Sequence, residues 1–98
     1  MPVTSVTRWK IDHDEAKKLA SEAAPHLKRH GASAVRVGYC HSGSFTTQTM
    51  VIVIYPDWET YGKAVQAQSH DTAYQHVFSQ ALKAGELQER MVLVTHDL

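Results

Sequence analysis

The stretch MVIVIYPDWETY, residues 50–61, carries the pattern of a strand followed by a helix. Residues 50–55 are apolar throughout and rich in β-branched side chains, which predicts a strand with two dry faces. Pro56 ends this strand because it cannot donate a ladder hydrogen bond. The carboxylate of Asp57 can then accept backbone N–H groups at the start of a helix. A strand of this kind needs a packed layer on each side.

Strand and helix patterns alternate along the rest of the chain. Clusters of β-branched and aromatic residues predict strands at residues 3–11, 34–40, 47–55 and 91–95. A helix begins at Asp12, which forms a capping box with Glu15, and it ends at Gly31. Pro25 should kink its last turns, because proline lacks the N–H that would bond the carbonyl of Ser21.

The helix that follows Asp57 carries two apolar stripes. The first comprises Trp58, Tyr61, Gly62 and Val65, and the second Tyr74, Val77, Phe78, Ala81 and Leu82. A continuous helix would place these stripes on opposite sides, so the helix must break near residues 69–71. Thr72 with Gln75 supplies a fresh capping box, and Asp71 favours local side-chain to backbone bonds. Gly85 ends the second segment.

The resulting order is strand, helix, strand, strand, helix, strand. This is the ferredoxin-like α+β class, an antiparallel sheet with two helices on one face, and it uses residues 1–98 as a single domain. Residues 91–94, like 50–55, are apolar on both sides. Two helices cover only one face of the sheet, so we expect the other face to pack on a second copy of the chain in a homodimer.

Composition excludes several classes of partner. Ten Lys plus Arg balance ten Asp plus Glu, which leaves no excess positive charge for nucleic acid or an anionic membrane. No apolar run approaches the ~20 residues needed to cross a bilayer, and the N-terminus lacks a secretory signal, so the cytoplasm is the expected location.

Glu22, His26 and His30 stand four apart, but Pro25 disturbs that spacing and we expect no metal or other cofactor. Cys40 is the only cysteine and is expected to be a packed, unreactive side chain.

His70 is the first candidate for catalysis because it falls at the predicted helix break, where irregular backbone often lines a pocket. It would act as a general base near neutral pH, assisted by Tyr74. The alternative is an ordinary turn histidine. Side chains that could contact an aromatic ligand are Trp9, Tyr39, His41, Tyr55 and Trp58.

The element order, with YPDWETY at 55–61 and SHDTAY at 69–74, resembles the dimeric α+β barrel superfamily, in particular its antibiotic-biosynthesis-monooxygenase type. The resemblance implies paired sheets and covers quinone-forming oxygenases, polyketide cyclases, heme-degrading enzymes and proteins without known activity. Heme-degrading members use an Asn, a Trp and a His. Thr7 or Arg8 stands at the Asn position and Ala67 at the Trp position, so only His76 remains. Ala67 also replaces the Tyr of the cyclases.

Two functions stay open. The first is a cofactor-independent monooxygenase or cyclase that acts on an aromatic or polyketide-like molecule between the helices and the sheet. The second is a non-catalytic ligand-binding or accessory dimer module whose histidines do no chemistry. An interior filled by side chains, with no cavity for a ring, would favour the second.

Overall fold

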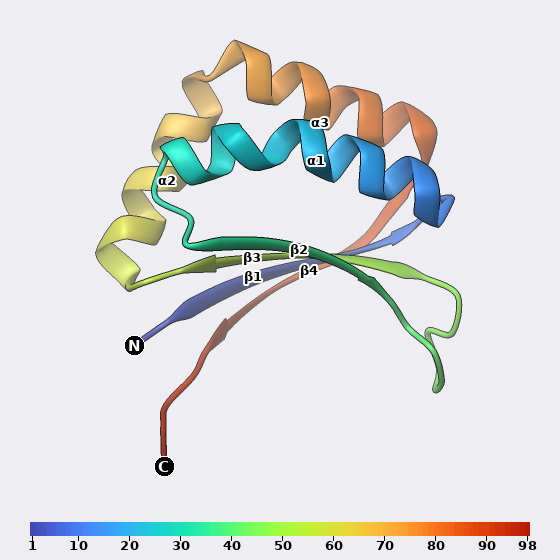
Figure 1. The fold of residues 1–98 in the computed structure, drawn as a ribbon, viewed down its shortest axis with the longest axis horizontal. Coiled ribbons are helices and arrows are strands. Elements are labelled where there is room, and N and C mark those ends of the chain that lie inside the picture. The colour runs from blue at the N-terminus through green and yellow to red at the C-terminus, as the bar shows by residue number, and fades with distance from the viewer.

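The computed structural model describes residues 1–98 as a four-stranded antiparallel sheet with three helices on one face (Figure 1). The elements are β1 (Val3–Lys10), α1 (His13–Arg29), β2 (Ala34–Tyr39), β3 (Thr49–Tyr55), α2 (Trp58–His70), α3 (Thr72–Ala84) and β4 (Glu86–Val94). The strands lie in the order β2-β3-β1-β4. This arrangement confirms the predicted ferredoxin-like class. None of the helices is both long and apolar enough to span a bilayer.

The helix starts follow the predicted aspartates. The Asp12 carboxylate accepts the backbone N–H of Glu15 at 3.0 Å, and the Asp57 carboxylate accepts that of Thr60 at 2.7 Å. Carboxylates suit these positions because the first backbone N–H groups of a helix have no partner within it. Helix α1 continues through Pro25 to Arg29, so the proline does not end it.

The break in the second helix is confirmed, since α2 ends at His70 and α3 begins at Thr72. The capping residue differs from the predicted Thr72. Asp71 lies between the helices in an extended conformation, and its carboxylate accepts the backbone N–H of Tyr74 at 3.0 Å. Thr72 is already helical, so the side chain before it takes the capping role.

The last strand is longer than predicted. It begins at Glu86 rather than Met91, and residues 86–94 pair with β1 along its whole length, with an irregularity opposite Arg8 and Trp9. Because β4 lies at the sheet edge, its first half is exposed and carries polar side chains that give no apolar strand signal. The other strands end within two residues of the predicted bounds.

The two faces of the sheet have different surroundings. On the helix side, Val3, Val53 and Tyr55 are buried with Leu27 of α1 and Ala64 of α2 in one core cluster. The alternate residues form an open face, which bears no helix (Figure 1). Cross-strand neighbours on the open face are Val6, Ile52 and Met91 in one row, and Thr4, Ile54 and Leu93 in the next.

Candidate ligand-binding cavity

A cavity of about 170 Å³ lies between the sheet and the helices. Strands β1, β3 and β4 form its floor, and α1, α2 and α3 contribute the rest of its lining. Of its 20 lining residues, 16 are hydrophobic, including Leu19, Val51 and Val77. Small residues on the helices leave this space open, because Ala20 of α1 and Ala81 of α3 stand where longer side chains would fill it. An apolar recess with few polar groups is the usual form of a small-molecule site.

Four of the polar groups that line the cavity already have partners, because they bond to one another in two pairs. The Gln68 amide donates to the Tyr55 hydroxyl at 2.8 Å, and the Trp9 indole N–H donates to the Thr7 hydroxyl at 2.8 Å. These two hydrogen bonds fix the orientation of Tyr55 and Trp9, which belong to the strands of the floor. The Arg90 guanidinium makes no hydrogen bond or ion pair with another side chain, although it lines the cavity.

Burial sets the protonation of the cavity tyrosines. Loss of solvent raises the pKa of Tyr55, an effect that the Gln68 hydrogen bond partly opposes. Loss of solvent also raises the pKa of Tyr74, while the positive charge of Arg90 acts in the lowering direction. Both phenols therefore stay protonated near neutral pH and can donate hydrogen bonds. The lining contains no His, Asp, Glu, Lys or Cys, so it offers no group that accepts a proton near pH 7.

Aromatic rings form one wall of the cavity. The Trp9 and Phe78 rings meet edge to face with centroids 5.9 Å apart, and Phe78 stacks on Tyr74 at 6.3 Å. Tyr55 and Tyr61 make a second edge-to-face pair at 5.4 Å. Rings placed in this way offer both faces and edges to a further ring.

Of the residues singled out in the sequence, Trp9, Tyr55 and Tyr74 line the cavity. Trp9 and Tyr55 point to the helix side of the sheet, and Tyr74 descends from the first turn of α3. The structure thus brings together one predicted catalytic residue and two predicted ligand contacts.

The other four predicted residues do not line it. His70 is exposed at the end of α2. The chain turns at Asp71, and the side chain that points toward α1 is that of Asp71. His41 is exposed in the loop after β2, and Trp58 is 52% exposed in the first turn of α2. Tyr39 is 58% exposed on the edge strand.

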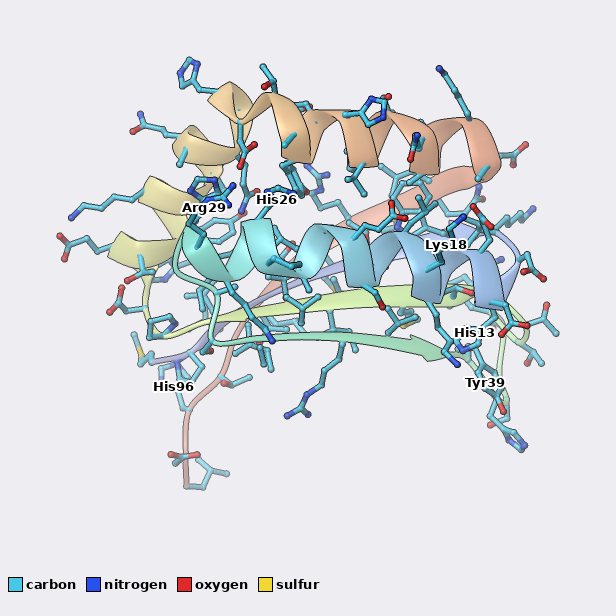
Figure 2. The ribbon with its side chains drawn as sticks, turned by 45° about the horizontal axis from the view of Figure 1, so that its top comes forward. His13, Lys18, His26, Arg29, Tyr39 and His96 are labelled. Carbon is cyan, nitrogen blue, oxygen red and sulfur yellow. The ribbon has the colours of Figure 1, made fainter.

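Figure 2 shows Tyr39 beside His13 at the start of α1 and His26 and Arg29 at its other end. The Tyr39 and His13 rings meet edge to face at 5.1 Å. At the other end, Asp71 accepts hydrogen bonds from Arg29 at 2.9 Å and pairs with His30 at 2.8 Å. The chain holds no group of three or more His, Cys, Asp or Glu side chains arranged to bind a metal ion.

Arg90 and Gln68 are cavity residues that the sequence analysis did not select. Arg90 lies outside the predicted strand of residues 91–95, so the sequence pattern does not indicate which face of the sheet it occupies. The alternation of Arg90, Val92 and Val94 along β4 is the signal that places it on the helix side.

The fold and cavity make this chain a small ferredoxin-like α+β protein with an apolar recess under its helices. Residues 1–93 match the family described as a domain of unknown function, DUF6854, and the chain belongs to this family. No curated protein matches the chain.

Solved structures share the fold at low sequence identity. A mutant form of SnoaB, a cofactor-independent oxygenase from Streptomyces nogalater, is 12% identical with a TM-score of 0.73 over 99% of this chain and 95% of its own. A NIPSNAP domain protein from Burkholderia xenovorans is 17% identical with a TM-score of 0.74 over 96% and 94%. A protein assigned to antibiotic biosynthesis monooxygenases, from Chloroflexus aurantiacus, is 10% identical with a TM-score of 0.69 over 99% and 95%. These likenesses show that the chain shares the ferredoxin-like α+β fold of these proteins.

Proposed function

We propose that this chain is a small-molecule-binding protein whose cavity holds an aromatic ligand. The observation that carries the proposal is the cavity itself, an apolar space of about 170 Å³ walled by Trp9, Tyr74 and Phe78. A space of this kind inside so small a domain reduces packing, since cavities cost stability when they stay empty. A flat apolar ring bound in the cavity would restore the missing van der Waals contacts.

Binding fits the cavity better than acid–base catalysis does. The cavity offers hydrogen-bond donors at Tyr55 and Tyr74 and a cation at Arg90, but no base near neutral pH. His70, the base expected from the sequence, does not line the cavity. The proposed site therefore does not include His70.

Calorimetric titration with phenol tests the proposal, together with a variant that fills the cavity. Ala81→Leu adds a branched side chain to the lining, and we expect it to weaken phenol binding at least tenfold. Ala73→Leu makes the same change at an exposed position of α3 and should leave binding unchanged. Ala23→Val fills the cavity from α1 with less overpacking, in case Ala81→Leu folds poorly. Equal phenol affinity in the wild type and in folded cavity variants would rule out this site.

A second candidate is cofactor-independent oxygenation, which the likeness to SnoaB favours. In this reaction a phenol and dioxygen give a para-quinone and water: one oxygen atom enters the ring, and the other leaves with the hydroxyl hydrogen and the para hydrogen. The substrate itself is the reductant. The protonated Tyr55 and Tyr74 would donate hydrogen bonds to the ring oxygen. Oxygen uptake with 2,6-dimethoxyphenol, and its loss in Ala81→Leu, is the expected result; uptake no faster than without protein would exclude the reaction for this substrate.

We also propose that two chains pair through the open face of the sheet. Met91 and Leu93 are 42% and 43% exposed there, beside Ile52 and Ile54 of β3. Apolar side chains on adjacent strands make a contiguous patch, which a second copy related by a two-fold axis would cover. The cavity lies on the opposite side of the sheet, so pairing leaves it available.

A further inference from the structure

We propose, building on the aromatic-ligand function above, that the ligand is a single-ring aromatic compound with one anionic substituent, held by Arg90 of β4. Three features of the cavity carry this inference: its volume, the position of its only charge, and the polar groups that remain without partners.

The volume limits the ligand to one ring. An apolar cavity of about 150 Å³ in another protein accepts benzene, and the cavity described here measures about 170 Å³. The polyketide-like ligand that the sequence suggested is therefore less suitable than a substituted benzene.

Arg90 is the only lining residue with a formal charge. It lies opposite Thr7 in the pairing of β1 with β4, and its guanidinium carbon is 6.0 Å from the centre of the Phe78 ring. An anionic substituent on a ring bound against Phe78 would therefore lie within reach of the guanidinium.

A comparison with Arg8 shows why Arg90 is available. Arg8 lies on the open face, where it is 3.6 Å from the Glu89 carboxylate, 2.6 Å from the Gln48 amide oxygen and 3.7 Å from the centre of the Phe45 ring. The Arg8 guanidinium is therefore already occupied by contacts within the protein. Arg90 has no carboxylate partner, and Glu89, its neighbour in sequence, is on the other face with Arg8.

Tyr74 completes the anion subsite. Its hydroxyl makes no hydrogen bond within the protein, and the charge of Arg90 is close enough to act on its pKa. A guanidinium and a phenol can together donate to one carboxylate or phenolate oxygen. The charge of Arg90 favours an anionic ligand over a neutral analogue by about tenfold, whereas the Tyr74 hydroxyl can donate to either.

Calorimetric titration with 4-hydroxybenzoate, its neutral amide 4-hydroxybenzamide, and phenol tests the inference. We expect 4-hydroxybenzoate to bind the wild-type protein about tenfold more tightly than the amide. Arg90→Gln should abolish that preference, because it removes the only formal charge of the lining. Lys83→Gln removes the same charge from an exposed position on α3 and should keep the preference.

The outcomes separate this inference from the proposed function. If phenol binds but the acid and the amide bind equally in wild type and in Arg90→Gln, the anion subsite is wrong while the aromatic cavity stands. If the preference persists in Arg90→Gln, another cation is responsible and the assignment of Arg90 is wrong. If none of the three compounds binds, the proposed function fails and this inference fails with it.

Discussion

Gly31 connects α1 to β2 in a conformation that other residues rarely adopt. Its φ is 114°, and its backbone N–H donates to the Lys28 carbonyl at 3.1 Å as the helix ends. A Cβ added at Gly31 would lie 2.5 Å from the Thr60 methyl carbon. The glycine thus allows the start of α2 to approach the end of α1, which brings both helices over the cavity.

Gly31→Ala should therefore destabilise the protein by about 1–3 kcal/mol, because it combines backbone strain with a steric clash. Gly62→Ala is the matched control: Gly62 is exposed in α2, a Cβ there meets nothing within 4 Å, and helical propensity should raise stability by about 0.5–1 kcal/mol. Urea unfolding of both variants measures the difference. Equal stabilities would show that the Gly31 backbone is not constrained.

The break between α2 and α3 depends on Asp71, which joins three elements. One carboxylate oxygen caps α3 at Tyr74, and the other contacts Arg29 and His30 at the end of α1. The Tyr74 N–H, His30 and Arg29, in that order, lower the pKa of Asp71 well below its usual range. The same cap begins the turn that directs Tyr74 into the cavity.

Stability should consequently depend on the ionised form of Asp71. A carboxyl whose pKa is lowered by folding stabilises the native state above its unfolded pKa of about 3.9, and that contribution is lost as pH falls further. Asp71→Asn, which keeps a capping oxygen but loses the charge, should melt below wild type at pH 7, and the difference should shrink toward pH 2. Asp71→Ala should melt lower still, while Asp97→Asn near the chain end should match wild type. A melting difference for Asp71→Asn that does not change with pH would contradict this role of the charge.

Local signals predicted these elements well, and long-range contacts account for the differences. The Asp12 and Asp57 caps and the helix break were all predicted from neighbouring residues. The direction of His70 was not, because it follows from contacts between Asp71 and α1 residues about 40 positions earlier in sequence. The cavity position of Arg90 was not predicted either. Residues 86–90 of β4 have a polar sequence, and they form a strand only because they pair with β1.

The molecule as a whole is a sheet with one covered face and one open face. The helices cover one face of the sheet (Figure 1), and the open face presents Ile52, Met91 and Leu93. We expect a dimer in dilute buffer, because burial of this patch removes apolar area from water at about 25 cal/mol per Å².

Ile52→Lys should convert that dimer to a monomer, since it places a charge at the centre of the patch, between Val6 and Arg36 in the strand register. Lys63→Glu, an exposed change on α2, should leave the dimer intact. Sedimentation velocity measures both. A wild-type protein that sediments as a stable monomer would contradict pairing through the open face.

An isotope-filtered NOE spectrum of methyl-labelled protein with 4-hydroxybenzoate tests directly whether an aromatic ring binds under the helices. A ring bound there should give NOEs from its protons to the methyl groups of Leu19, Val51 and Val77, which line the cavity. NOEs only to Ile52 and Leu93 on the open face, or no intermolecular NOEs at saturating ligand, would contradict binding in the cavity.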